Sequence, residues 1–305
     1  MITHALVRTG LTLASAVLAT SALLASPIGT PVAHAAPTTN ANIAKKQLPV
    51  VSATFNSTKA GKVDPTSFRS QVGSTNSDTG AYLGMTYRKD YRGSGNVVRT
   101  TLAKDKYILS KGEGRGNVLM VKLPKSYDSA CMSYDVRFAA GFDFSAGGKL
   151  PGFVGVAPGV SATTPTGGGS SAHGFSGRLM WLGSKMWKFV RDADRSNMAV
   201  TYLYHPGQVR QWGDNVSWGA SFKPGVWHTV KQCNVMNTIG KADGVLQTWF
   251  DGKLVMQQTD VVYRTDPNVH ITHFDWSIFR GGDNADWASS TVGYVDMDNL
   301  KITAG

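Results

Sequence analysis

The sequence is poor in glutamate: it contains only one, Glu113, in a Gly-rich segment. Enzymes that hydrolyse glycosidic bonds normally place two carboxylates on either side of the scissile bond, one of them protonated. The Glu-x-Asp-x-Glu pattern of many glycosidases with a jelly-roll fold therefore cannot occur in this chain. Aspartate pairs remain at Asp192-x-Asp194 and Asp296-x-Asp298. The composition thus disfavours a glycoside hydrolase and leaves it as one alternative.

Cysteine is also scarce, with only Cys131 and Cys233. In an oxidising compartment an isolated pair of this kind usually forms one disulfide. The apolar alternation around each cysteine places it on the more polar side of an expected strand. We therefore predict a disulfide between neighbouring strands, with two buried free thiols as the alternative.

Long apolar runs are rare as well. One such run, Leu11 to Leu24, follows the positive charge of Arg8 and precedes Ala33-His34-Ala35. This is the pattern of a secretory signal peptide with its cleavage site, and we assign it to residues 1–35. No other run approaches the roughly 18 apolar residues that span a membrane. We expect a soluble, secreted protein without a membrane partner.

Helical periodicity is missing too, because no segment shows it over the roughly 11 residues that would identify a helix. From residue 117 onward, short apolar runs alternate with turn residues, such as Asp251-Gly252 between two strand-like runs. This pattern predicts an all-β domain, an antiparallel β-sandwich of the jelly-roll type, over residues 81–305. We interpret residues 36–80, rich in Thr, Ser, Asn, Ala and Lys, as a linker.

The pattern also locates strands, loops and exposed aromatic residues. The expected strands are 118–123, 131–138, 150–156, 175–181, 186–191, 200–204, 228–237, 245–250, 254–259, 271–279 and 292–302. Two long Gly- or Ser-rich loops, 157–173 and 205–223, flank the central strands and are placed to wall a cleft. Indoles in or near loops can stack on sugar rings, although most tryptophans are simply packed. The tryptophans in such places are Trp212, Trp218, Trp227 and Trp287.

Acidic residues are outnumbered: 20 Asp and Glu face 31 Lys and Arg, which gives a formal net charge of +11. Removal of Arg8 with the signal peptide leaves 11 − 1 = +10. Such a surplus favours an anionic partner through long-range attraction. The basic residues are dispersed and form no DNA-reading helix, so we predict an acidic polysaccharide rather than nucleic acid. Charge retained for solubility is the alternative.

Polar side chains recur two residues apart in the middle of the chain: Ser176 with Arg178, and Tyr202 with Tyr204. Residues two apart in a strand point to the same face. Each pair therefore projects from one side of an expected strand, while apolar neighbours face the core. Lys149, in the segment Gly-Gly-Lys-Leu-Pro-Gly, adds a further positive charge. Together these positions predict a catalytic cleft.

The same residues suit a lyase that acts on a polyuronate. Such an enzyme must neutralise the sugar carboxylate, remove the proton on carbon five and protonate the oxygen that leaves carbon four. Arg178 suits the first task because a guanidinium binds a carboxylate in bidentate fashion, and Lys149 adds charge. Tyrosine, with a pKa of about 10, is a poor base at neutral pH unless nearby cations favour its phenolate. We expect both cations to lower the pKa of Tyr202 and Tyr204, and Ser176 to position a tyrosine or the substrate.

These residues and others over residues 117–302 resemble the alginate and glucuronan lyases of polysaccharide lyase family fourteen. The matching segments are Tyr134-Asp-Val-Arg-Phe138, Gly141-Phe-Asp-Phe144, Gly147-Gly-Lys-Leu-Pro-Gly152, Gly174-Phe-Ser-Gly-Arg-Leu-Met-Trp181, Tyr202-Leu-Tyr204, Gly225-Val-Trp-His228, Trp249-Phe-Asp-Gly-Lys253 and Phe279-Arg-Gly-Gly282. The resemblance implies a jelly roll whose concave sheet binds a polyuronate and cleaves it by β-elimination without a catalytic metal. The family's functional residues would fall on Lys149, Ser176, Arg178, Tyr202 and Tyr204.

Two departures from the family pattern bear on the substrate. Gly177 stands where a larger polar residue is common, and the insert 183–198 is longer than expected. We expect both to change the shape of the cleft. No cofactor is expected, although a structural calcium ion near Asp296 and Asp298 is an option. We expect a monomer that acts on alginate or glucuronan; a non-catalytic carbohydrate-binding module of the same fold is the alternative.

Overall fold

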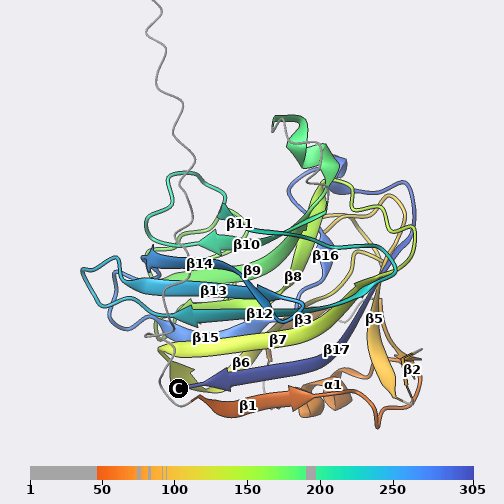
Figure 1. Cartoon of the computed structure of the whole chain (residues 1–305), viewed down its shortest axis with the longest axis horizontal. Helices are drawn as coiled ribbons and strands as arrows, with labels where there is room; N and C mark the ends of the chain where they lie inside the picture. Colours follow the sequence, from red (N-terminus) through yellow and green to blue (C-terminus); the bar gives the residue numbers. More distant parts are fainter. Residues whose placement is uncertain (1–46, 74–76, 82–83, 91, 94, 190–196) are drawn as a thin grey trace, which may run out of the picture. The chain divides into compact units, whose positions relative to one another are not determined.

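The structure, a computed structural model, describes residues 47–73, 77–81, 84–90, 92–93, 95–189 and 197–305. The expected signal peptide and the pair Asp192-x-Asp194 lie outside this part. Within it, the strands form two sheets whose strand pairs are antiparallel. This arrangement confirms the predicted β-sandwich of the jelly-roll type (Figure 1).

The two sheets are assembled from strands that are distant in the sequence. In the described residues, the first sheet runs β14 (Lys253–Val261), β13 (Gly244–Phe250), β12 (Trp227–Val235), β7 (Ser129–Phe138), β17 (Gly293–Ala304), β5 (Asn96–Leu102), β4 (Met85–Lys89) and β2 (Gly61–Lys62). The second runs β11 (Asp214–Ser221), β10 (Met198–Tyr204), β9 (Gly174–Leu182), β8 (Gly147–Val156), β15 (His270–Asp275), β6 (Val118–Tyr127) and β3 (Ser77–Ala81), and β16 (Phe279–Arg280) pairs with β8. The short helical segments are α1 (Pro65–Gln71), η1 (Ser184–Phe189) and η2 (Ala285–Trp287).

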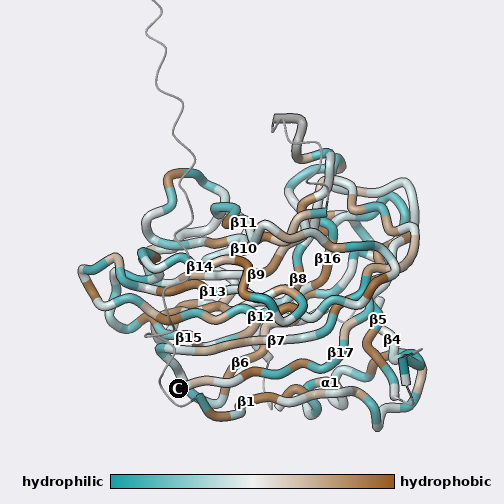
Figure 2. The backbone as a smooth tube through the Cα atoms, in the orientation of Figure 1, coloured by the Kyte–Doolittle hydropathy of each residue, from teal (hydrophilic) through white to brown (hydrophobic). Residues whose placement is uncertain are grey.

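The core lies between the sheets because the strands alternate apolar and polar residues. Along β7, Val136 and Phe138 are fully buried, whereas Asp135 and Arg137 between and beside them stay partly exposed. Hydropathy alternates in the same way along several strands (Figure 2). The Phe138 ring lies 5.2 Å from the ring of Trp181, which comes from β9 of the other sheet. Aromatic contacts of this kind join the two sheets behind the predicted site.

The linker prediction for residues 36–80 is wrong from Leu48 onward, where regular elements begin. Strand β1 (Leu48–Ala53) pairs with β17 at the other end of the chain, with Ala53 opposite Leu300. Helix α1 begins at Pro65 after the N-cap residue Asp64, and it buries Phe68 completely. The polar composition concealed a few well-spaced apolar residues that find their partners only through long-range pairing.

Two further expectations about elements are corrected. A strand was expected over residues 186–191, but residues 184–189 form the 3-10 helix η1. A loop was expected over residues 205–223, but β11 (Asp214–Ser221) occupies its second half as the edge strand beside β10. Polar strands at a sheet edge carry weak periodicity, which explains why the pattern did not indicate β11.

The predicted disulfide between Cys131 and Cys233 is present. The two residues are direct partners in the register of β7 and β12, with Cα atoms 4.0 Å apart. The disulfide therefore joins neighbouring strands, as expected from the alternation. None of the helices in the described residues is long and apolar enough to cross a membrane.

The acidic residues of β17 are paired with arginines. The carboxylate of Asp296 lies 2.6 Å from Nε of Arg99 and 3.3 Å from a terminal nitrogen of Arg137. The carboxylate of Asp298 lies 2.9 Å from a terminal nitrogen of Arg92. These carboxylates, considered above as ligands of a structural calcium ion, thus hold strands β5, β7 and β17 to their neighbours through charge-assisted hydrogen bonds.

Candidate active site

Three adjacent strands of the second sheet, β8, β9 and β10, bring the predicted site residues together. The register sets Tyr202 opposite Arg178 and Tyr204 opposite Ser176. Lys149 lies on the next strand, opposite Met180, two positions from Arg178 along β9. Because residues opposite each other in a sheet share a face, all the predicted side chains project from the same part of the second sheet.

A cleft of about 750 Å³ lies over this part of the sheet. Lys149 and Tyr202 contribute to its lining together with Met180. Loop residues that precede β11 form one wall, and the segment around η2, which contains Trp287, forms part of another. The volume lies in the range of about 300–1,000 Å³ that is usual for ligand pockets. Ser176, Arg178 and Tyr204 are buried next to the cleft floor.

Lys149 is buried, with only 5% of its surface exposed. Its Nζ lies 3.1 Å from the sulfur of Met180, 3.5 Å from the carbonyl oxygen of Gly281 and 4.1 Å above the ring of Tyr202. No carboxylate is among these neighbours. Burial, and then the positive charge of Arg178, lower the pKa of Lys149 well below its ordinary value.

The phenol of Tyr202 behaves differently from the expectation. Burial raises the pKa of Tyr202, and the neighbouring phenol of Tyr204, 3.5 Å away, adds to this. Arg178 opposes the shift, but its Cζ is 6.0 Å from the Tyr202 ring and the opposition is too weak. The predicted lowering of the Tyr202 pKa is therefore wrong, since desolvation outweighs the charge. Burial therefore favours the protonated phenol of Tyr202 and the uncharged amine of Lys149.

Arg178 is held by a carboxylate that the sequence analysis did not find. A terminal nitrogen of Arg178 lies 3.5 Å from the carboxylate of Asp275 on β15. Gly152 lies between them in the register of the sheet and has no side chain to obstruct the contact. Ser277 donates a hydrogen bond to Asp275, and burial raises the pKa of Asp275 in spite of Arg178. In the sequence, Asp275 stands in the middle of the expected strand 271–279, and nothing there indicates its contact with Arg178.

Ser176 and Tyr204 contact the Gly-rich loop 157–173 rather than the cleft. The hydroxyl of Ser176 donates to the carbonyl oxygen of Pro165 over 2.6 Å, and the backbone N–H of Gly168 donates to the phenol of Tyr204 over 2.8 Å. Both side chains are fully buried. Gly168 has a φ of +86°, which favours glycine there. These two residues fix the position of the loop beside the cleft.

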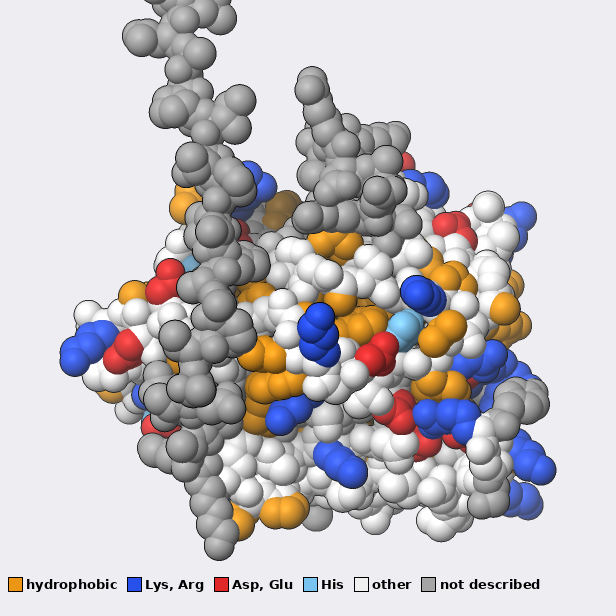
Figure 3. Space-filling view, in the orientation of Figure 1, with side chains coloured by type: hydrophobic (Ala, Val, Ile, Leu, Met, Phe, Trp, Pro, Cys, Tyr) orange, Lys and Arg blue, Asp and Glu red, His pale blue; other side chains and the backbone are white. Residues whose placement is uncertain are grey.

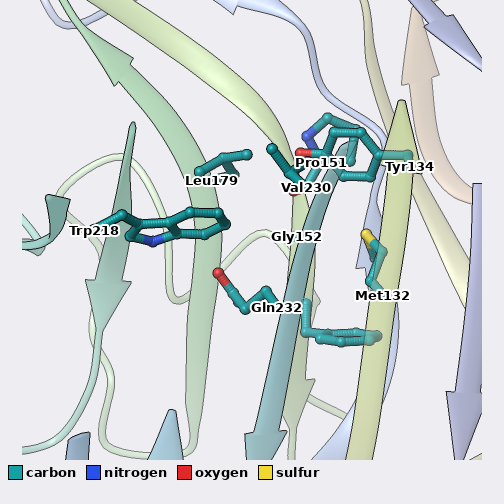
Figure 4. A pocket seen from close by; sticks show the side chains of 9 residues that line it. Met132, Tyr134, Pro151, Gly152, Leu179, Trp218, Val230 and Gln232 are labelled. Atoms are coloured by element: carbon teal, nitrogen blue, oxygen red, sulfur yellow. Dashed lines mark hydrogen bonds between the residues drawn. The ribbon is translucent and has the colours of Figure 1, made fainter. Parts of the chain in front are cut away.

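A buried polar network supports the catalytic strands from the core side. Gln232 on β12 donates to the carbonyl oxygen of Gly177 over 2.9 Å and accepts from the hydroxyl of Thr201 over 2.8 Å. Trp218 donates to the same hydroxyl over 2.9 Å. Figure 4 shows Gln232 and Trp218 beside a cavity of only about 10 Å³, about the size of one water molecule. The network thus ties the first sheet to β9 and β10 midway between the site residues.

The two departures in sequence act differently in the structure. Gly177 faces the core, where a Cβ would come within 3.4 Å of the amides of Gln232 and Asn234. The glycine therefore makes room for the network and does not shape the cleft, contrary to the expectation. The insert does contribute to the cleft through Met186 of η1. Its residues 190–196 lie outside the described part.

The tryptophans expected to stack on sugars fall into two groups. Trp212 and Trp287 line the cleft. Trp218 is buried, and the guanidinium carbon of Arg92 lies 3.7 Å from the ring centroid of Trp227 in a cation–π contact. In the described residues, no group of three or more His, Cys, Asp and Glu side chains could hold a metal ion.

A family model described as polysaccharide lyase 14 matches residues 90–300, more than half of the chain. The chain belongs to the polysaccharide lyase 14 family. This confirms the predicted family and enzyme class. Solved structures agree with the fold: a marine PL-14 alginate lyase from Aplysia kurodai is 21% identical, with a TM-score of 0.71 over 85% of this chain and 100% of that chain.

Other relatives extend the comparison. Alginate lyase Aly36B is 24% identical, with a TM-score of 0.66 over 83% of this chain and 95% of that chain, and a mutant of it has been solved with alginate tetrasaccharide. Exolysin from Paramecium bursaria Chlorella virus 1 is 25% identical over 197 residues, which are 58% of this chain. The match spans 29% of that longer protein.

The Gln232 network predicts that a substitution in the core lowers both stability and activity. Replacing Gln232 with leucine leaves the carbonyl of Gly177 and the hydroxyl of Thr201 without this partner, at a cost of about 1–3 kcal/mol per unsatisfied group. We expect lower stability and a lower kcat, because β9 and β10 lose a shared support. Denaturant unfolding and steady-state kinetics measure the two effects. Gln247→Leu is the matched control, since Gln247 is buried in β13, away from β9 and β10. An unchanged kcat in Gln232→Leu would contradict the prediction.

Proposed function

We propose that this protein is a secreted lyase that cleaves an acidic polyuronate, alginate or glucuronan, by β-elimination. The observation that carries the proposal is the pair Lys149 and Tyr202 in the lining of one cleft, with the amine 4.1 Å above the phenol ring. Burial lowers the pKa of the Lys149 amine and raises the pKa of the Tyr202 phenol. The two groups therefore favour their neutral forms and do not form an ion pair. A base and an acid side by side are what an elimination requires.

In the proposed reaction, the neutral amine of Lys149 takes the proton from carbon five of the sugar. The electron pair of the broken C–H bond forms a double bond between carbons four and five, and the bond from carbon four to the bridging oxygen breaks. Tyr202 gives its proton to that leaving oxygen. Exchange with solvent then returns a proton to Tyr202 and removes one from Lys149. Arg178, fixed by Asp275, supplies the positive field that stabilises the charge on the sugar carboxylate.

This assignment divides the predicted residues by position. Lys149 and Tyr202 transfer protons, Arg178 neutralises charge, and Ser176 with Tyr204 positions the loop 157–173. The polyuronate proposal is supported by the family, by the neighbouring alginate lyases and by the net charge of +11. Secretion is supported by the apolar segment of residues 1–35 and by the Cys131–Cys233 disulfide.

The test is ultraviolet absorbance of the purified protein incubated with alginate blocks, glucuronan and a neutral glucan. We expect a rise with one of the polyuronates, because elimination leaves a double bond conjugated to the carboxylate. Reducing ends without absorbance would instead indicate a hydrolase. Binding without any product would indicate a carbohydrate-binding module, and either result would overturn the proposal.

A further inference from the structure

A group of basic side chains lies on strands β2 and β4 and in the loop before β2, at one end of the first sheet. Its members are exposed, and the ion pairs found among the described residues include none of them. They are Lys59, Lys62, Arg88 and Lys89, here called the basic edge. Figure 3 shows Lys and Arg side chains gathered over this end of the molecule, where Figure 1 places β2.

The charge of the basic edge is not cancelled by its neighbours. Two carboxylates are near in the sequence: Asp64 accepts the backbone N–H of Ser67 over 2.7 Å as the N-cap of α1, and Asp90 pairs with Arg92. By contrast, Arg92 a few residues further on contacts the carboxylates of Asp90, Asp135 and Asp298. The cations of the basic edge therefore remain available to an outside anion.

A surface hollow of about 440 Å³ contains two of these cations, Lys59 and Lys62, in its lining, and Tyr87 of the lining precedes Arg88 and Lys89 on β4. The rest of the lining is almost wholly composed of groups that donate and accept hydrogen bonds. These are Ser57, Thr58, Asp64, Ser67, Ser70, Gln71 and Tyr87. Hydroxyl and amide groups match the hydroxyls of a sugar, and ammonium groups match its carboxylates.

We propose that the basic edge and this hollow form a second binding site for an acidic polysaccharide chain, separate from the cleft. Lysine on an edge strand also discourages sheet-to-sheet pairing. That role alone does not account for the hydroxyl-lined hollow beside the lysines or for Arg88 and Lys89 on the adjoining strand. The polymer is identified by the proposed function, on which this inference rests for its ligand.

The second site belongs to the first sheet, and the cleft belongs to the second sheet. One long polymer can therefore occupy both sites, or the second site can hold the enzyme on the polymer while the cleft releases its products. Tethering raises the effective concentration of substrate at the cleft, so a second weak site strengthens overall binding to long chains but not to short ones.

The test compares two variants that each remove four positive charges. The first changes the basic edge and consists of K59Q, K62Q, R88Q and K89Q. The matched control changes exposed lysines on other elements and consists of K223Q, K241Q, K253Q and K301Q. Binding to long polyuronate is measured by affinity electrophoresis, with Lys149→Ala added to prevent turnover. Turnover of a uronate trisaccharide is measured in the active background.

We expect the basic-edge variant to bind long polymer at least about tenfold more weakly, with trisaccharide turnover unchanged. The control should stay within about twofold of the parent. Equal weakening in both variants would mean that only net charge matters and would overturn the proposal. Equal binding of double-stranded DNA at the basic edge would overturn it too, because the surface would then recognise any polyanion.

If the variant with four substitutions fails to fold, the double variant K59Q and K62Q removes only the cations of the hollow. It should still show a measurable part of the decrease in polymer affinity. Retention of full polymer affinity in this pair would count against the site. The two proposals can fail separately. If the protein that keeps Lys149 gives no rise in absorbance, the lyase reaction is refuted, but weaker polymer binding in the basic-edge variant would still support the second site.

Discussion

Replacing Lys149 with methionine is expected to abolish elimination and, at the same time, to stabilise the fold. Loss of a general base typically lowers the rate by about 10²–10⁴-fold. Methionine keeps the length and apolar stem of lysine, so the shape of the site should survive. Ultraviolet absorbance with polyuronate measures the activity, and thermal unfolding measures the stability.

The stabilisation follows from the lowered pKa of Lys149. The unfolded chain binds a proton on this amine at every pH below its ordinary pKa, whereas the folded chain releases it at a much lower pH. Between the two pKa values the unfolded state holds more protons, so Lys149 destabilises the fold there and does so less as the pH rises. Methionine removes this cost. The melting temperature of Lys149→Met should exceed that of the parent at neutral pH, and the gap should narrow toward high pH.

The pH dependence of the parent enzyme gives a second check on the same amine. A base acts only when deprotonated, so kcat/KM should rise with pH along a limb that lies well below the ordinary lysine pKa. Lys149→Arg is the informative control, because arginine keeps the positive charge but stays protonated. If Lys149 only neutralised the substrate carboxylate, Lys149→Arg would retain much of the activity, and the assignment of the base would be wrong.

The sequence was sufficient to place the candidate site residues on shared strand faces, because this placement depends on a local rule. Side chains two apart in a strand share a face, so Ser176 with Arg178 and Tyr202 with Tyr204 could be paired without any structure. The register of β9 and β10 then sets these pairs opposite each other. Alternation around Cys131 and Cys233 worked in the same way, since it needed only the face of each strand.

The pKa of Tyr202 could not be obtained in this way, because it depends on how much water the surroundings exclude. Counting nearby cations gave the wrong direction. Arg178 is present, but it is turned toward Asp275, and the amine of Lys149 is itself too buried to hold its charge firmly. The burial of a side chain depends on the loops and strands around it, so it cannot be predicted from a motif of a few residues.

Strand pairing between distant parts of the chain was the other feature that could not be predicted from the sequence. Strand β1 lies some 250 positions before its partner β17 in the sequence, with Leu48 opposite Ala304. Nothing local in the polar stretch of residues 36–80 indicates that partner. The supporting residues Gln232 and Asp275 were missed for the same reason: each reaches the site from a strand distant in sequence, and the residues around it give no sign of that contact.

Replacing Tyr202 with phenylalanine is expected to lower kcat by about 10²–10⁴-fold while KM changes little. The ring remains, so packing beneath Lys149 is kept and only the proton donor is lost. Tyr204→Phe is the matched control. The Tyr204 phenol accepts the N–H of Gly168, and its loss should weaken the loop 157–173 with a much smaller effect on kcat. A larger loss in Tyr204→Phe than in Tyr202→Phe would exchange the roles of the two residues.

A change of leaving group separates the acid from the base more directly. An acid is needed only when the departing oxygen is strongly basic. If carbon four of the uronate carries an acidic phenol, the phenolate should leave without a proton from Tyr202. On that substrate, Tyr202→Phe should recover most of the parent rate, because carbon–oxygen cleavage no longer needs a proton. Lys149→Met should stay inactive, because carbon five must still lose its proton. Recovery in both variants, or in neither, would mean that the two residues do not divide the proton transfers as proposed.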